Sequence, residues 1–229
     1  MTSVSVVIRV TKDERIYRTI KSLESQDYKE IIVVQNGTEK WGELENFCNE
    51  NNIKFLYFEK GNASKAYNVG AEVASGDILL LCDSDAYFTK DYIEDVKKYT
   101  EYGWIVGGGL IYDDFGEKLL ASNKACFLYK SDYEKIGGHD EDFAKPNATD
   151  VAFCLRARQK GIKSKVIPQA IYYHPATAHK RGFKVGRAEA RANRRYPGYQ
   201  KTWRMIGWDV LEIWRIIKHT VGLMVGRIM

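Results

Sequence analysis

The sequence predicts an α/β fold in which a mostly parallel central sheet is flanked by helices. From about residue 4 to residue 81, short runs of consecutive apolar residues alternate with segments whose apolar residues recur every three or four positions. The runs are typical of strands buried on both faces, and the spacing is typical of helices that bury one face. Regular alternation of strands and helices predicts parallel strands in one sheet, with right-handed crossovers and helices on both faces.

The first half of the chain contains four predicted strands, at residues 4–10, 31–34, 53–58 and 78–81. Three predicted helices separate them, and their inward residues are Ile16, Ile20 and Leu23, then Trp41, Leu44 and Phe47, then Ala66, Val69 and Val73. Thr11 or Asp13 can cap the first helix, and Gly76 stands where a helix-ending glycine is common. Residues 35–38 have the composition of a turn.

The second half is less regular. A helix is predicted from Thr89 or Asp91 to about residue 99, followed by strands at 104–112 and 119–129 and a helical turn at 133–136. A further helix begins at Thr149 or Asp150 and ends at Gly161, and extended pieces then reach His174. Three consecutive glycines, residues 107–109, interrupt the first of these strands. They indicate a bulge or a close approach of a ligand or another backbone, with a plain kink as the alternative.

The composition changes sharply after about Pro175. The chain carries a net charge of +5, but residues 176–229 hold 12 Lys or Arg against 3 Asp or Glu, a net of +9, so the remainder carries −4. We therefore divide the chain into a globular domain at 1–175 and a basic tail at 176–229, and the tail indicates an anionic partner. The four cysteines are scattered and are expected to be reduced, and no signal peptide is recognisable, which favours the cytoplasm.

The tail also contains an amphipathic pattern. Its apolar stripe consists of Trp203, Ile206, Val210, Ile213, Ile217, Val221, Met224 and Ile228. Charges interrupt this helix too often for it to span a bilayer, so it is expected to lie on an anionic membrane surface through residues 183–229. Packing on its own domain or on a second subunit is the alternative, and no recognised nucleic-acid module accompanies it.

Two aspartates, Asp83 and Asp85, follow the buried strand at 78–81. Open α/β sheets bind ligands at the carboxyl ends of their strands. Carboxylate oxygens suit a hard divalent ion, Mg²⁺ or Mn²⁺, particularly one that also holds substrate phosphates. Aspartate is also common in turns, and an isolated D-x-D pattern is more often a turn than a cation site, so the surrounding sequence must decide.

Five motifs follow one another along the chain. They are VSVVIRVTKDER from residue 4, VVQNGT from residue 33, GNASKAYNVGAEVASGDILLLCDSD from residue 61, IGGHDEDFAKPNATDVAFCLRARQKG from residue 136 and PQAIYYH from residue 168. In this order they resemble the inverting family 2 glycosyltransferases of the GT-A fold, over about residues 4–174. The resemblance implies a nucleotide-sugar half at about 1–88 and an acceptor half at about 89–175.

The resemblance also implies roles for individual residues. Asp150 would be the catalytic base, Asp85 the direct metal ligand with Asp83 in support, and His174 a further ligand, with His179 a weaker substitute. Donor contacts would come from Thr11, Arg15, Asn36, Lys65, Asn68 and Asp83. In the tail, Arg181 belongs to a basic segment able to reach the diphosphate, because cations there would help the leaving group.

Three positions depart from the family pattern. Gln35-Asn36 replaces the usual aspartate that contacts the base, Thr149 replaces a glutamate before Asp150, and His139 replaces a common aromatic residue. The expected function is a metal-dependent inverting glycosyltransferase at the cytoplasmic membrane face, using Mn²⁺ or Mg²⁺, a nucleotide-diphosphate sugar and a glycan or lipid-linked acceptor. A polyprenyl-phosphate glycosyltransferase and a degenerate GT-A scaffold without activity are the alternatives.

Overall fold

The computed structural model describes residues 2–112, 118–119, 125–143, 149–174 and 195–196. In this part of the chain, nine strands form one sheet with the order β3-β2-β1-β4-β8-β6-β9-β5, and β7 pairs with β6. The strands are β1 (Val4–Val10), β2 (Glu30–Asn36), β3 (Lys54–Phe58), β4 (Ile78–Asp83), β5 (Tyr87–Phe88), β6 (Trp104–Tyr112), β7 (Lys118–Leu119), β8 (Ala125–Tyr129) and β9 (Lys163–His174). The predicted α/β class is confirmed.

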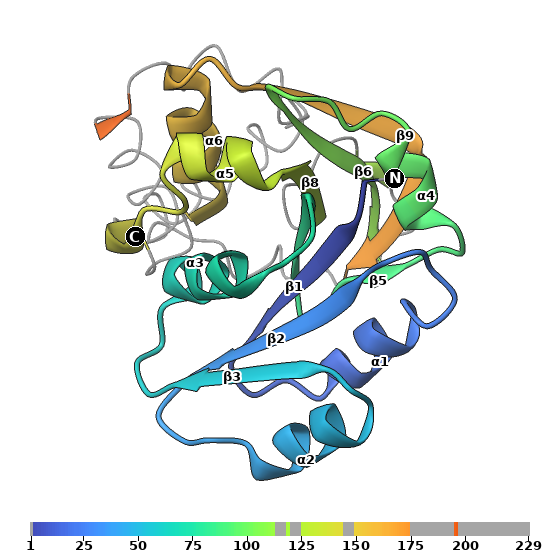
Figure 1. Cartoon of the computed structure of the whole chain (residues 1–229), viewed down its shortest axis with the longest axis vertical. Helices are drawn as coiled ribbons and strands as arrows, with labels where there is room; N and C mark the ends of the chain where they lie inside the picture. Colours follow the sequence, from blue (N-terminus) through green and yellow to red (C-terminus); the bar gives the residue numbers. More distant parts are fainter. Residues whose placement is uncertain (1, 113–117, 120–124, 144–148, 175–194, 197–229) are drawn as a thin grey trace, which may run out of the picture.

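Helices cover both faces of the sheet (Figure 1). They are α1 (Arg15–Lys21), α2 (Gly42–Glu50), α3 (Ala63–Val73), α4 (Tyr92–Lys97), α5 (Lys130–Ile136) and α6 (Thr149–Gln159), with a 3₁₀ turn, η1, at Glu141–Phe143. Figure 1 shows α1 and α2 on one side of β1–β3, and α3, α5 and α6 on the other. Strand β1 illustrates the consequence, because Val6 and Ile8 pack in the core on the α1 side while Val7 packs in the core on the α3 side.

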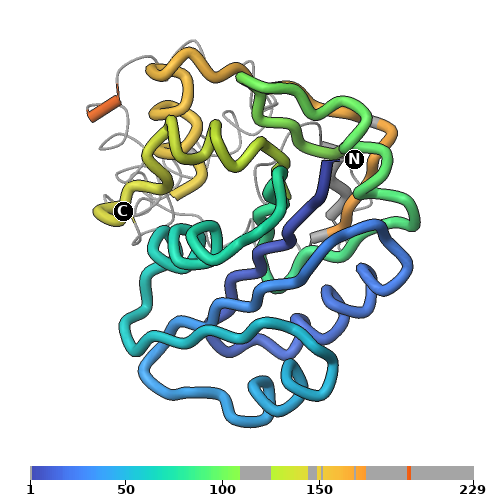
Figure 2. Tube along the Cα trace, viewed as in Figure 1, coloured from blue at the N-terminus to red at the C-terminus, as the bar shows by residue number. Residues whose placement is uncertain are grey.

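The first half of the sheet is parallel, as predicted. Strand β1 pairs in parallel with β2 and with β4, and β2 pairs in parallel with β3. The next neighbour, β8, runs antiparallel to β4. The path of the chain in Figure 2 shows β1, in dark blue, running between β2 and β4. The carboxyl ends of β1, β2 and β4 therefore meet at one edge, where α/β sheets bind their ligands.

The second half differs in detail from the prediction. The extended pieces before His174 form one strand, β9, which runs parallel to β6 with a register shift between Gly108 and Gly109. A Cβ atom at Gly108 would lie 2.4 Å from the carbonyl oxygen of Ala170 and 2.5 Å from the ring of Tyr92. The glycine run thus marks a close backbone approach, as expected. The strand predicted at 119–129 is described as β7 and β8, and residues 120–124 between them lie outside the described part.

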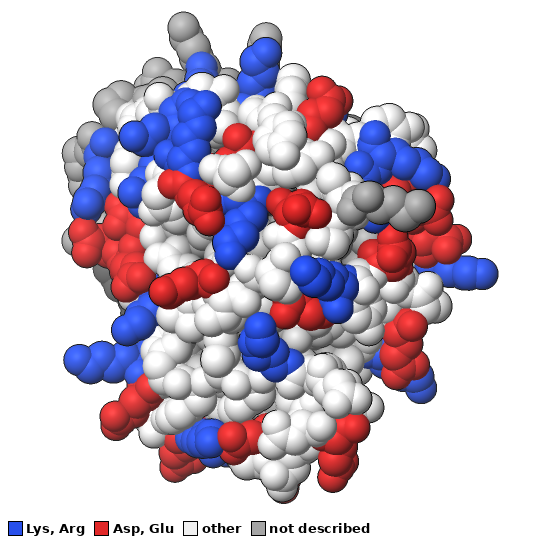
Figure 3. Space-filling view, viewed as in Figure 1, with Lys and Arg blue, Asp and Glu red and all other residues white. Residues whose placement is uncertain are grey.

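Only two residues of the predicted tail are described, Arg195 and Tyr196, and both contact the globular domain. The expected amphipathic helix after residue 200 lies outside the described residues. Among the helices that are described, none has the length and hydropathy needed to cross a bilayer. Figure 3 shows one face of the molecule, on which acidic and basic side chains are interspersed, with basic side chains densest at the upper left, in the region of α5 and α6.

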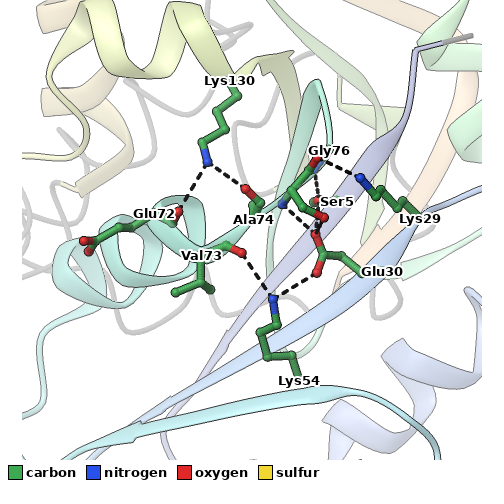
Figure 4. Close-up of polar contacts among 10 residues, drawn as sticks. Ser5, Lys29, Glu30, Lys54, Glu72, Val73, Ala74, Gly76 and Lys130 are labelled. Atoms are coloured by element: carbon green, nitrogen blue, oxygen red, sulfur yellow. Dashed lines mark hydrogen bonds and ion pairs between the residues drawn. The ribbon is translucent and has the colours of Figure 1, made fainter.

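A carboxylate at the amino edge of the sheet joins three segments (Figure 4). Oε1 of Glu30 accepts hydrogen bonds from the hydroxyl of Ser5 at 2.8 Å and from the backbone nitrogen and hydroxyl of Ser75 at 2.7 Å each. Its Oε2 lies 3.2 Å from Nζ of Lys54 on β3. Burial alone would raise the pKa of Glu30, but the hydrogen bonds from Ser75, Ser5 and Lys54 outweigh it and lower the pKa to about 2.

We expect Glu30→Gln to lower the free energy of unfolding at pH 7 by about 2 kcal/mol. Because the folded-state pKa lies below the ordinary value, the contribution is fully present above about pH 4.5 and is lost as the pH falls towards about 2. The variant should therefore lose less stability than wild type over this interval, which urea unfolding at pH 7, 4 and 3 measures. Glu134→Gln on the exposed face of α5 is the control. An unchanged acid response in the Glu30 variant would contradict the assignment.

Candidate active site

The candidate site begins at the carboxyl ends of β1 and β2. The register pairs Val10 with Gln35, so the residues that follow each strand lie side by side. The hydroxyl of Thr11 donates to Oδ1 of Asn36 at 2.9 Å, which joins two of the predicted donor-binding residues. Gln35 is buried, and its amide contacts the backbone of Thr11, Glu39 and Trp41. The residue that departs from the family pattern thus orders the loop after β2.

Asp83, the last residue of β4, is held by two neighbours. Nη2 of Arg9 lies 2.7 Å from Oδ1 of Asp83, and the hydroxyl of Tyr67 donates to the same oxygen at 2.7 Å. Burial lowers the pKa of Arg9, but the charge of Asp83, followed by Tyr67 and Asp150, outweighs it and raises the pKa. The guanidinium therefore remains charged. Sequence reasoning missed Arg9, although a single cation within the apolar run of residues 4–10 is a visible signal.

Asp85 lies in the turn after β4 and faces α1. Its Oδ2 is 3.3 Å from Nη2 of Arg15, which also forms a two-point contact with Asp13 at 2.9 and 2.7 Å. The hydroxyl of Thr19 donates to the carbonyl oxygen of Ser84 at 2.8 Å, so α1 holds the backbone between the two aspartates. The D-x-D turn is therefore fixed by helix contacts, and the predicted residues Arg15 and Asp85 are brought together.

Asp150 is the second residue of α6, at the helix end where the dipole stabilises an anion. Burial and the charge of Asp83 raise the pKa of Tyr67, and the charge of Asp150 adds to this rise. The charge of Asp150 also contributes to the raised pKa of Arg9, after the larger contribution of Asp83. The Asp150 carboxylate therefore shares an electrostatic environment with the Asp83 group. The preceding residue, Thr149, is buried and donates from its hydroxyl to the carbonyl oxygen of Phe143 at 3.2 Å.

A stack of three rings connects α3 with α6. The imidazole of His139 lies between Tyr67, with a centroid distance of 4.8 Å, and Phe153, with a centroid distance of 4.1 Å. Its Nδ1 is 2.9 Å from the hydroxyl of Tyr133. Burial, and after it the charges of Arg9 and Arg156, lower the pKa of His139 to about 3, so the ring is neutral at neutral pH. His139 thus serves as an aromatic spacer between the helices that carry Tyr67 and Asp150.

Two predicted donor contacts occupy other surroundings. The side-chain amide of Asn68 accepts from the hydroxyl of Tyr133 at 2.7 Å and from the backbone nitrogen of His139 at 2.8 Å, and it donates to the carbonyl oxygen of His139 and to Glu141 at 3.0 Å each. Asn68 therefore fixes the loop after α5. Lys65 is exposed, and its Nζ lies 5.3 Å from the ring centroid of Phe58. A direct donor contact from either residue stays a prediction.

The remaining predicted ligands lie at or beyond the end of β9. The antiparallel register pairs Tyr87 with Tyr173, which brings the backbone of His174 beside the D-x-D turn. The side chain of His174, together with His179 and Arg181, lies outside the described part of the chain.

The described side chains suit a hard cation that shares its coordination with substrate. In this region the carboxylate of Asp83 contacts Arg9, and the carboxylates of Asp13 and Asp85 contact Arg15. The charge of Asp150 also acts on Arg9. No three His, Cys, Asp or Glu side chains within the described residues form a metal site by themselves. A cation held by Asp85 and Asp83 would take its other oxygen ligands from phosphates and water, an arrangement typical of Mg²⁺.

Comparisons of sequence identify a family. Residues 5–165 match the profile of glycosyl transferase family 2. The chain is 34% identical over 116 residues to the glycosyltransferase GlyA of Streptococcus pneumoniae, a match over 48% of this chain and 17% of GlyA. It is 28% identical over 137 residues to the uncharacterised glycosyltransferase YwdF of Bacillus subtilis, over 57% of this chain and 51% of YwdF. The matches therefore cover only 17% and 51% of the length of these two relatives.

Solved structures show the same fold. The structure of residues 1–349 of Staphylococcus aureus TarS matches with a TM-score of 0.61 at 18% identity, over 76% of this chain and 60% of that one. GalNAc-T7, crystallised with UDP, GalNAc and Mn²⁺, matches with a TM-score of 0.69 at 12% identity, over 85% of this chain and 48% of that one. The fold is that of the GT-A glycosyltransferases. Because the family profile covers most of the chain, the protein belongs to glycosyl transferase family 2.

Proposed function

We propose that the protein is a metal-dependent inverting glycosyltransferase that moves a sugar from a nucleotide-diphosphate donor to a glycan or lipid-linked acceptor. The observation that carries this proposal is the placement of Asp83 and Asp85 at the carboxyl edge of the sheet, with Asp150 on an adjoining helix end. Family membership and the GT-A fold support the reaction class.

Asp85, assisted by Asp83, would hold Mn²⁺ or Mg²⁺, which when bound neutralises the departing diphosphate. The two-point contact with Asp13 orients Arg15 beside Asp85, so its guanidinium can add a further donor to a phosphate oxygen. Arg9 contacts Asp83 at 2.7 Å and offsets the negative charge of that carboxylate. These residues bind and orient the leaving group.

Asp150 would act from the opposite side of the sugar. Its carboxylate takes the proton of an acceptor hydroxyl while that oxygen forms a bond to the anomeric carbon. The bond from the anomeric carbon to the diphosphate oxygen breaks in the same displacement, which inverts the configuration. The position at the start of α6 favours the ionised form of Asp150 before the proton is transferred.

The location of the protein is a further part of the proposal. The net charge of +9 in residues 176–229 supports peripheral contact of residues 183–229 with the anionic cytoplasmic face of a membrane. The acceptor would then be presented at that surface. Packing of this segment on a second subunit is the competing arrangement.

The experiment that tests the proposal is a thermal-shift screen of UDP-, GDP-, dTDP- and CMP-sugars, each with and without Mn²⁺. A donor that binds the folded state raises the melting temperature by mass action, and the proposed metal site requires a larger rise with Mn²⁺. The panel covers four bases because Gln35-Asn36 replaces the aspartate expected at the base. If no nucleotide sugar shifts the transition under either condition, the enzyme proposal fails and the scaffold alternative is favoured.

A further inference from the structure

Two residues that follow the globular domain in sequence dock onto a loop beside the proposed base. Arg195 and Tyr196 contact the segment between α5 and α6, and Figure 1 shows them on the α5 and α6 side of the molecule. The hydroxyl of Tyr196 donates to Oδ2 of Asp140 at 2.6 Å, and Nε of Arg195 lies 3.2 Å from the same oxygen. Nη1 of Arg195 donates to Asp142 at 2.6 Å.

The docked residues contact a carboxylate that is almost removed from water in the folded chain. The side chain of Asp140 is only 8% exposed. Within residues 125–174, its described partner is the backbone nitrogen of Asp142, 3.1 Å from Oδ1, while Oδ2 receives both contacts from Arg195 and Tyr196. An ionised carboxylate at this depth needs such partners, because burial without them is costly. The contact therefore gives the buried Asp140 carboxylate the partners that it needs.

A hydrogen bond links the same loop to the start of α6, where Asp150 stands. The ring of Phe143, at the end of η1, packs against Tyr196 with a centroid distance of 6.1 Å. The carbonyl oxygen of Phe143 accepts the hydrogen bond from Thr149, the first residue of α6. On its inner side the loop is fixed to α3 through Asn68. The docked pair supplies the outer anchor of a loop whose end sets the first turn of α6.

We infer that Arg195 and Tyr196 are positioning residues that belong to the catalytic unit and fix Asp150 through the loop at residues 140–143. The inference rests on the proposed function, in which Asp150 is the catalytic base. It also moves the boundary of the functional domain from residue 175 to residue 196 or later. A shift of about 1 Å in a catalytic group can cost a hundredfold in rate, so an outer anchor of this kind can act on the rate of transfer.

The test uses the full chain with Arg195→Ala, Tyr196→Phe and Asp140→Asn, assayed with the donor identified in the screen. We expect Tyr196→Phe and Arg195→Ala to lower kcat about tenfold, with donor affinity changed less than twofold. Tyr196→Phe placed on the Asp140→Asn background should have little additional effect, because the two changes remove the same contact. Tyr99→Phe and Lys98→Ala, both exposed in the turn after α4, are matched controls and should behave as wild type.

A merely structural role would lower the melting temperature while leaving kcat per folded molecule unchanged, and that result would overturn the inference. Additive effects of Asp140→Asn and Tyr196→Phe on the free energy of unfolding would overturn the docking itself. The unfolding cycle needs no activity. If wild type transfers no sugar, the proposed function has failed, and the cycle still decides whether residues 195 and 196 are docked on Asp140.

Discussion

Asp150→Asn is expected to lower the rate of sugar transfer by about a thousandfold, within the range of 10²–10⁴ typical of a lost general base. The amide has the size of the carboxylate but cannot take the acceptor proton. Donor binding should change less than threefold, because Asp150 stands on α6 and the donor contacts are proposed at the ends of β1, β2 and β4. Initial rates with saturating donor, together with donor titrations followed by thermal shift, measure both quantities.

The matched control is Asp95→Asn, a half-buried aspartate on α4 that should keep wild-type rates. Full transfer to a hydroxyl acceptor by the Asp150 variant would remove the base from the mechanism. Transfer that survives only with a polyprenyl-phosphate acceptor would favour the alternative enzyme, since a phosphate nucleophile needs little base catalysis. The choice of acceptor therefore separates the two reactions in one series of assays.

Asp85→Asn should weaken Mn²⁺-dependent donor binding by about a hundredfold, which corresponds to about 2.7 kcal/mol. The substitution keeps the shape of the side chain and removes the charge proposed to hold the cation. We expect the free energy of unfolding without ligand to change by less than about 1 kcal/mol, because the contact with Arg15 at 3.3 Å is partly exposed. Isothermal titration of Mn²⁺ in the presence of donor is the measurement.

Asp83→Asn provides the contrast. Oδ1 of Asp83 accepts contacts from Arg9 and Tyr67, so its neutralisation should reduce stability by about 1–3 kcal/mol in addition to any loss of binding. A binding defect with little loss of stability for Asp85, and a loss of both for Asp83, is the expected pattern. An unchanged requirement for Mn²⁺ in the Asp85 variant would contradict its assignment as the direct ligand.

Much of the parallel half of the fold could be predicted because its strands are continuous apolar runs. Runs such as residues 4–10 and 78–81 are buried on both faces, so local sequence alone identifies them. The D-x-D pair and Asp150 could be chosen as candidates because each stands within a family motif, and their roles stay predictions. The boundaries were less accurate, since Asp83 is the last residue of β4 and lies inside the strand.

The contacts around these residues could not be predicted in the same way. The stacking of His139 between Tyr67 and Phe153 depends on which helices share a face of the sheet, and no periodicity in the sequence specifies that. The motif of Asn68 resembles the family and predicts a donor contact, which stays a prediction, but no pattern in the sequence indicates that its amide also orders the loop after α5. The docking of Tyr196 on Asp140 joins residues that are 56 positions apart, with no local signal on either side.

The pairing of β5 with β9 limits how the two halves of the domain could be exchanged between proteins. The short strand β5 belongs to the predicted nucleotide-sugar half, yet it pairs with Tyr172 and Tyr173 near the end of the predicted acceptor half. Together with the antiparallel pairing of β4 and β8, it interlocks the two halves. An exchange of halves at residue 88 would therefore have to reproduce both strand pairings at once.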